Sequence, residues 1–194
     1  MSEAPSPDPH LAPLPGELPL SSPGFAAVDR TVGGVCAALN VLGTLLILGL
    51  AVLVNVDVIG RAAFGAPVSG VPEIVSLSIV AIVFLQAAQA ARAGRFIRSD
   101  ALLRALARRA PRAAAWLDAL WHAAALALIW IVAQASWPLF LKAWDRDEFV
   151  GAVGDFTAPV WPVKAVLLVG CGALMAQFAL GLVRAVAAGL RRAP

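Results

Sequence analysis

TVGGVCAALNVLGTLLILGLAVLVNV, Thr31–Val56, is a run of 26 residues without Asp, Glu, Lys or Arg. An α-helix rises about 1.5 Å per residue, so a helix of this length can cross the roughly 30 Å hydrocarbon core of a bilayer. Three further runs without charge contain 18, 23 and 19 residues: Ile74–Ala91, Ala119–Leu141 and Ala165–Val183. The sequence therefore predicts four transmembrane helices.

The composition of the whole chain supports a membrane protein. The 194 residues are 60% hydrophobic and 14% charged, whereas a soluble domain is about 25% charged. A soluble all-α protein would need a polar face on each helix, and the four runs show little of one. We expect an all-α integral membrane protein whose membrane domain, residues 29–192, holds spans at about 31–56, 72–91, 116–142 and 163–185.

The N-terminal segment and the segment between the second and third spans have different characters. Residues 1–28 hold seven of the fourteen prolines, which predicts a disordered tail, either solvated or carrying a short linear motif. Residues 99–110 place leucines on one face and arginines on another. This pattern predicts a short amphipathic helix at the membrane interface, with a plain basic loop as the alternative.

Basic residues are distributed unevenly between the two sides of this topology. Eleven lie before the first run, between the second and third, or after the fourth, and four lie in the other two loops. Because basic loops stay in the cytoplasm, both termini are predicted to be cytoplasmic. The net charge of +3 then reflects topology and contact with anionic lipid, and nucleic acid is not indicated as a partner.

Residues that could carry redox or ion chemistry are sparse in the runs. Cys36 and Cys171 do not form the paired thiols of a redox enzyme. His122 is the single histidine there, too few for a bis-histidine haem, and is expected to form an interfacial or interhelical hydrogen bond. No ionisable residue lies near a midpoint, and no broken helix of a transporter site is evident. We expect no catalytic residue, cofactor or metal ligand.

Small residues and tryptophans indicate how the helices meet their surroundings. Glycine and alanine recur in the first, third and fourth runs and suit close helix packing, within the four-helix unit or against a larger partner. Tryptophans flank the ends of the third run and the start of the fourth, as in an aromatic belt. Trp130, Trp137 and Trp144 share one face, which could meet lipid or a partner protein.

The stretch after the first run, NVDVIGRAAFGAPVSGVPE at Asn55–Glu73, is predicted to form a turn at the outer side. Asp57 and Arg61 are four residues apart and can pair on one helix face. Gly65, Pro67 and Gly70 end the helix, and Pro72 and Glu73 suit the first turn of the next one. These local preferences do not explain why the turn holds Arg61 and Glu73 at the edge of the bilayer. An exposed ion pair contributes little to stability.

The chain resembles the small permease subunit of tripartite ATP-independent periplasmic (TRAP) transporters, the DctQ-like family. The resemblance extends over about residues 30–190 and rests on three loose motifs in matching order: the first turn, the segment after the second span and the segment before the fourth. Their residues here are Arg61, Phe64, Pro67 and Glu73; Gly94, Ile97 and Asp100; and Pro159 and Trp161. Many members have two acidic residues where this chain has Pro72 and Glu73.

The resemblance implies a non-catalytic subunit of a secondary transporter in the bacterial inner membrane. A large permease subunit would carry the substrate and sodium sites, and a periplasmic solute-binding protein would deliver an organic anion. This chain would scaffold the large subunit in the membrane. A stand-alone four-helix protein, either an oligomeric channel or a membrane redox enzyme, is the alternative.

Three groups of residues are given expected roles on this basis. The outer turn would contact the large subunit through Asp57, Arg61, Phe64, Pro67 and Glu73. The acidic residues of the second outer loop would dock the binding protein: Asp145, Asp147, Glu148 and Asp155. Arg and Trp side chains would anchor the chain at the membrane interfaces: Arg104, Arg108, Arg109, Trp116, Trp121, Trp144 and Trp161.

Overall fold

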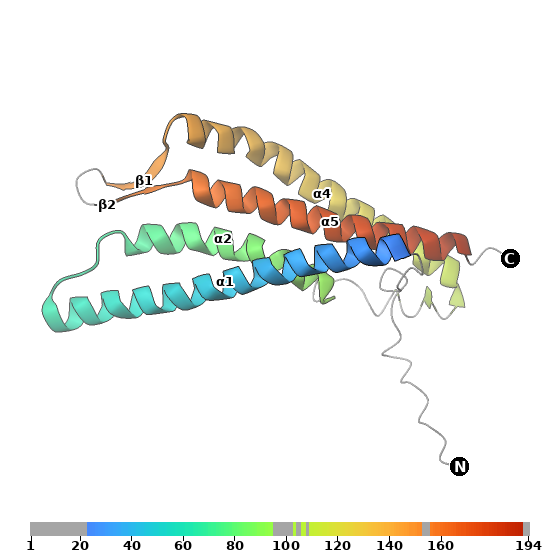
Figure 1. The fold of residues 1–194 in the computed structure, drawn as a ribbon, viewed down its shortest axis with the longest axis horizontal. Coiled ribbons are helices and arrows are strands. Elements are labelled where there is room, and N and C mark those ends of the chain that lie inside the picture. The colour runs from blue at the N-terminus through green and yellow to red at the C-terminus, as the bar shows by residue number, and fades with distance from the viewer. Residues whose placement is uncertain (1–22, 95–102, 104–105, 108, 153–155, 192–194) are drawn as a thin grey trace, which may run out of the picture.

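The computed structural model describes residues 23–94, 103, 106–107, 109–152 and 156–191. Four of its helices are long and apolar enough to cross a membrane, which confirms the predicted fold class. The elements follow one another in the order shown in Figure 1. They are α1 (Pro23–Phe64), α2 (Val71–Arg92), α4 (Pro111–Asp145), β1 (Phe149–Ala152), β2 (Phe156–Pro159) and α5 (Trp161–Arg191).

The helices are longer than the charge-free runs that predicted them. With 42 residues, α1 is about 63 Å long and must extend beyond the hydrocarbon core or tilt strongly. It begins at Pro23, so the last residues assigned to the tail are helical, and it ends at Phe64 beyond the Asp57–Arg61 pair. The helix α4 continues through Pro138 without a break. The remainder of the Pro-rich tail, residues 1–22, lies outside the described residues.

The loop between α4 and α5 forms a β-hairpin that the sequence did not predict. β1 and β2 are antiparallel, with Phe149 opposite Pro159 and Ala152 opposite Phe156. The described residues therefore form helices and one small two-stranded sheet. Asp155 falls in the connection 153–155, outside the described residues.

The predicted interfacial helix at residues 99–110 falls largely outside the described part of the chain. Leu103, Leu106, Ala107 and Arg109 have helical backbone, and Leu103 is buried. Arg104 and Arg108 lie outside the described residues, so their anchoring role stays a prediction.

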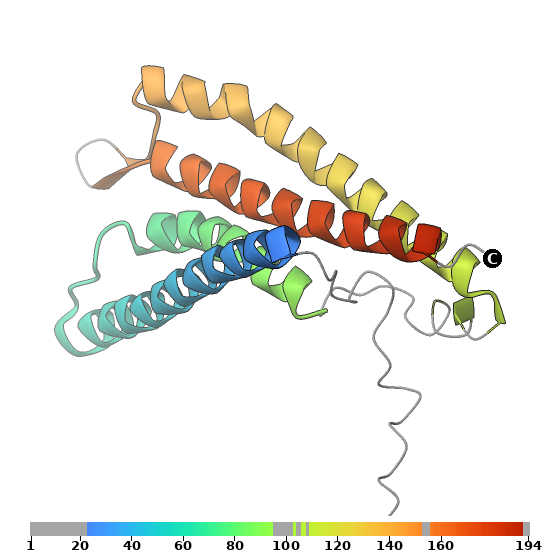
Figure 2. The same cartoon turned by 45° about the vertical axis from the view of Figure 1, so that its right-hand side comes forward.

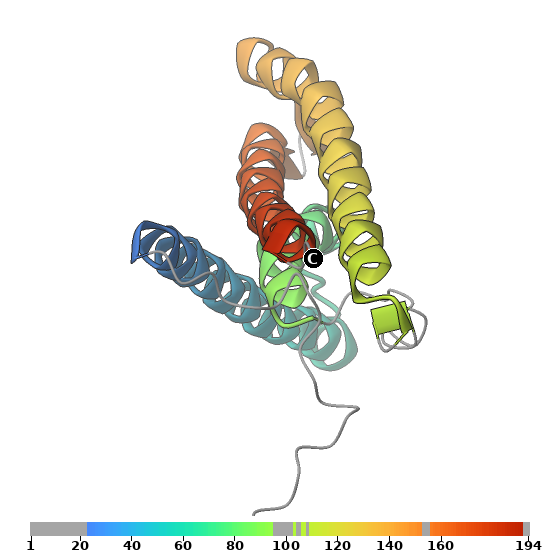
Figure 3. The same ribbon diagram turned by 90° about the vertical axis from the view of Figure 1, so that its right-hand side faces the viewer.

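The four long helices form a splayed layer with α2 and α5 in its middle. α5 packs against α4 on one side and α2 on the other, and α1 packs on α2 and more sparsely on α5. The helices lie close at the end where Arg92, Arg184 and Arg191 are found, and they separate toward the hairpin (Figures 1 and 2). We call these the arginine end and the hairpin end. Viewed along the helices, α1 and α4 stand apart on either side of α5 (Figure 3).

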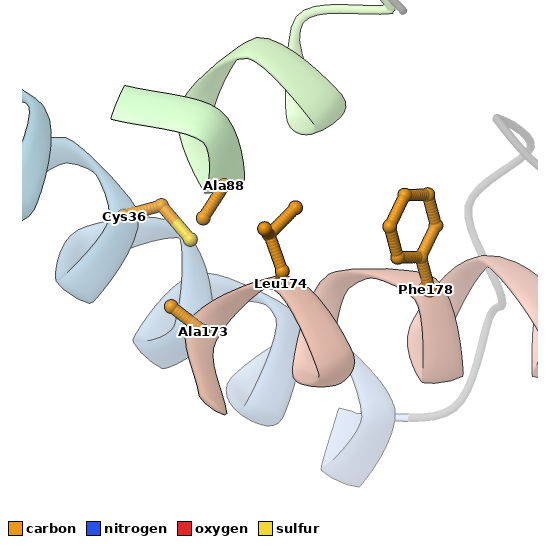
Figure 4. Packing of buried hydrophobic residues seen from close by; sticks show 5 residues of the cluster. All are labelled: Cys36, Ala88, Ala173, Leu174 and Phe178. Atoms are coloured by element: carbon orange, nitrogen blue, oxygen red, sulfur yellow. The ribbon is translucent and has the colours of Figure 1, made fainter. Parts of the chain in front are cut away.

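The buried core is small and lies where α1, α2 and α5 meet. Cys36, Ala88, Ala173, Leu174 and Phe178 form it, as Figure 4 shows. Small side chains allow this close approach of backbones. Most large apolar side chains are exposed instead, with Leu48, Leu120 and Ile131 each more than 60% exposed. In water such exposure would be unfavourable, so lipid or another membrane protein must cover these surfaces.

Candidate subunit-contact sites

The turn between α1 and α2 is built around the carboxylate of Asp57. This residue is 7% exposed. Its Oδ1 accepts a hydrogen bond from the backbone N–H of Val68, and its Oδ2 accepts one from the Arg61 guanidinium, both at 2.9 Å. The second contact is the pairing that the four-residue spacing predicted. The first satisfies a loop amide that has no helical partner.

Two close backbone approaches hold this turn in place. The Ala66 N–H donates to the Gly60 carbonyl at 3.2 Å, and a Cβ at position 60 would lie 2.9 Å from the Ala66 oxygen. Gly70 has φ +81°, a conformation that favours glycine. The Phe156 ring of β2 occupies the space a Cβ at position 70 would need. The hairpin therefore contacts the turn at Gly70.

The predicted contact residues of the turn divide into a structural pair and an exposed set. Asp57 is buried, while the side chain of its partner Arg61 is 63% exposed. Phe64 is 80% exposed at the tip of α1, and Pro67 is exposed in the loop. Glu73 lies half-buried in the first turn of α2 and does not pair with Arg61. The structure thus brings together two of the five residues.

Glu148, expected to dock a binding protein, is engaged within the chain. Its carboxylate accepts a hydrogen bond from Lys164 Nζ at 2.8 Å and lies 3.9 Å from Lys142 Nζ. The hydrogen bond from Lys164 holds the pKa of Glu148 below its ordinary value. Lys164 also donates to the Leu139 carbonyl at 3.1 Å, which ties the start of α5 to α4. Of the four acidic residues, Asp145 and Asp147 are exposed.

An ion-pair cluster that sequence reasoning missed joins three helices at the arginine end. The Asp29 carboxylate of α1 accepts hydrogen bonds from Arg92 of α2, at 3.0 and 3.2 Å, and from Arg184 of α5. The Arg184 guanidinium also lies 5.3 Å from the centre of the Phe25 ring. A signal was available, because Arg92 and Arg184 are the first charged residues after their runs and Asp29 lies just before the first run.

A second missed feature is the buried Asp118 beside His122 in the interface of α4 with α5. Asp118 is fully buried and His122 is 8% exposed. The His122 Nδ1 lies 2.8 Å from the Asp118 carbonyl oxygen and 3.5 Å from Oδ1. The imidazole fills the space above Gly181 and meets the Phe178 ring edge-on at 6.3 Å. His122 thus lies between two helices, but its hydrogen bond is to a residue of its own helix and not the expected interhelical one.

The predicted anchor residues lie at both ends of the molecule. Trp116 and Trp121 are exposed on α4 near the arginine end. Trp144 lies in the last turn of α4 at the hairpin end and meets Trp161 of α5 edge-on, with ring centres 4.8 Å apart. Arg109 is exposed. These positions are compatible with the predicted aromatic belt, whose role stays a prediction.

The fold defines a class before any relative is considered: a multi-pass helical membrane protein. Across the described residues, no group of three or more His, Cys, Asp or Glu side chains could hold a metal ion. Residues 50–188 match the family described as "Tripartite ATP-independent periplasmic transporters, DctQ component", and the chain belongs to this family of transporter components. No match was found among curated proteins or solved structures.

Proposed function

We propose that this chain is the non-catalytic small membrane subunit of a TRAP-type secondary transporter. It scaffolds a large permease subunit that takes up an organic anion with sodium, and a periplasmic solute-binding protein delivers the anion. Membership of the DctQ family supports the assignment to such a transporter. The subunit needs no cofactor of its own in this role.

The distribution of charge supports an orientation for this subunit. The arginine end carries Arg92, Arg112, Arg184 and Arg191, and basic segments remain on the cytoplasmic side. The arginine end therefore faces the cytoplasm of a bacterial inner-membrane protein, with both termini there. The hairpin and the α1–α2 turn then face the periplasm, where a solute-binding protein would approach Asp145 and Asp147.

The observation that carries the scaffold proposal is the splayed arrangement of the helices. α1 and α4 each contact the rest of the chain along one side and leave long apolar faces exposed. Neighbouring membrane helices separated in this way offer side-chain surface to a larger membrane protein. The exposed Arg61 and Phe64 at the end of α1 add a polar and an aromatic contact beyond the membrane core.

Co-purification from the native host tests this function. The tagged full-length chain is extracted in a mild detergent, and its partners are identified and quantified by mass spectrometry. We expect a large permease subunit of the same transporter class in a one-to-one ratio. Recovery of this chain as a homo-oligomer without that subunit would overturn the proposal in favour of a stand-alone channel.

A further inference from the structure

α4 contacts α5 through one side, and its opposite side is exposed over most of its membrane-spanning length. The side toward α5 includes the buried Asp118 and His122 and the half-buried Ile129. The opposite side includes two tryptophans seven residues apart, Trp130 and Trp137, each of which is more than half exposed. We call this set the exposed α4 face: Ala127, Trp130, Ile131, Gln134, Trp137 and Leu141.

Gln134 places two polar groups near the middle of the membrane on this face. The charge-free run Ala119–Leu141 is centred on Trp130, so Gln134 lies about 6 Å from the centre along the helix. Its side chain is exposed, and in the described part of the chain no hydrogen bond engages its amide. Its backbone carbonyl also lacks the usual donor four residues ahead, because Pro138 has no N–H. Hydrocarbon offers neither group a hydrogen bond.

Trp130 adds a third polar group at the same depth. It is 55% exposed at the centre of the charge-free run, whereas tryptophan in contact with lipid prefers the membrane–water interface, where its indole N–H meets water. Trp130 lies one turn before Gln134 on the same face. Two neighbouring residues on this face thus present hydrogen-bonding groups to the middle of the bilayer.

The exposed polar residues of α1 behave differently. The Thr44 hydroxyl donates to the Asn40 carbonyl at 2.9 Å, and the Asn55 amide donates to the Ala51 carbonyl at 2.7 Å. Each of these side chains therefore donates a hydrogen bond within its own helix, which suits a lipid environment. Both helices expose large apolar side chains to a similar degree. The exposed uncharged polar side chains of α1 thus donate within their own helix, whereas the exposed Gln134 of α4 does not.

From this contrast we infer that the exposed α4 face binds a transmembrane helix of the large permease subunit. The Gln134 amide and carbonyl hydrogen-bond to a polar side chain of that helix, and Trp130 and Trp137 pack on either side of the contact. The inference rests on the proposed function and specifies which face of the chain meets the large subunit. Lipid and a second copy of this chain are the competing occupants.

Site-specific photocrosslinking in native membranes distinguishes these occupants. The photoreactive residue p-benzoylphenylalanine replaces Ile131 on the exposed α4 face or Leu48 on α1, two positions that are 63% and 62% exposed. We expect irradiation to join position 131, and not position 48, to the large subunit. A product of two copies of this chain from position 131, or no protein product from it, would overturn the inference.

A pair of substitutions tests the hydrogen bonds themselves. Gln134→Leu removes the amide at similar volume, and Asn55→Leu makes the same change on α1. We expect Gln134→Leu to reduce the amount of large subunit retained after detergent washing about threefold, the average effect of one interhelical hydrogen bond, while Asn55→Leu leaves it unchanged. The melting temperature of the isolated chain should be the same in both variants. Equal retention in the two variants would contradict the inference.

These outcomes separate this inference from the proposed function. If the wild-type chain retains the large subunit but crosslinks to it from position 48 alone, the proposed function stands and the inference fails. If the wild-type chain retains no large subunit, both fail.

Discussion

The carboxylate of Asp57 accepts the backbone N–H of Val68 at 2.9 Å, eleven residues further along the chain. The same carboxylate binds Arg61 one turn away on α1. A single buried side chain therefore connects the end of α1 to the loop that returns to α2. This contact sets the position of the end of α1, where the exposed Arg61 and Phe64 lie.

Removing the Asp57 side chain should destabilise the turn. Asp57→Ala leaves the Val68 N–H without its acceptor, and we expect the free energy of unfolding to fall by about 1–3 kcal/mol. Asp57→Asn keeps an oxygen that can accept this hydrogen bond and should cost less. The free energies can be measured by titrating detergent micelles with SDS and following tryptophan fluorescence. Equal losses in the two variants would show that the hydrogen bond to Val68 does not stabilise the turn.

Phe64 should contribute to binding the large subunit without supporting the fold. It is 80% exposed, so Phe64→Ala is expected to leave the melting temperature unchanged. If the tip of α1 contacts the large subunit, Phe64→Ala should weaken the binding free energy by at least about 1 kcal/mol, as for an aromatic contact in an interface.

Leu190 provides the control for Phe64, because it is 62% exposed at the opposite end of the molecule. Leu190→Ala should leave the affinity unchanged when both variants are compared in co-purification at several detergent concentrations. A loss in Leu190→Ala as large as that in Phe64→Ala would argue against a specific contact at the turn.

Gly181 should be intolerant of any side chain because the His122 ring fills the adjacent space. Gly181→Ala must displace the imidazole or move α4 away from α5, and overpacking of this kind costs about 1–3 kcal/mol. Gly172 on the same helix has nothing within 4 Å of the position of a Cβ, so Gly172→Ala should not destabilise. Thermal unfolding in detergent measures both. Adding His122→Ala to Gly181→Ala should recover part of the loss.

The Glu148–Lys164 contact should make the hairpin end sensitive to acid. Because the hydrogen bond from Lys164 lowers the pKa of Glu148 in the folded protein, ionised Glu148 stabilises the fold above its unfolded pKa. This contribution disappears as the pH falls through the lowered folded pKa. We expect the hydrogen-exchange protection of Val160, whose N–H donates to the Glu148 carbonyl, to be constant down to about pH 5 and to fall at more acidic pH.

Glu148→Gln is the control for this pH dependence. The amide side chain of this variant cannot ionise, so protection corrected for intrinsic exchange should be lower at neutral pH and independent of pH. The same acid-induced decrease in wild type and variant would exclude the Glu148 carboxylate as its origin.

Features that depend on local sequence were predicted correctly. The charge-free runs identified the four spans, because span length is set by the bilayer thickness and by the rise of the helix. The spacing of Asp57 and Arg61 predicted their pairing, because residues four apart share a helix face. Pro72 and Glu73 were placed correctly in the first turn of α2.

Features that join distant segments were not predicted. The hairpin strands have four residues each, too short for a periodic signal, and their pairing is a contact between segments. Arg92 and Arg184 were counted as topology signals, although both bind Asp29. Asp118 lies at the edge of a charge-free run, and its burial depends on where α5 packs.

The amino-acid sequence alone thus determined that this chain crosses a membrane four times, since local apolarity and helix rise suffice for that conclusion. Tertiary structure decided which helix faces are left open. Along the charge-free runs of α1 and α4 most residues are apolar, so the pattern does not mark a buried side. The close packing of α5 between α2 and α4 leaves the side chain of Gln134 exposed.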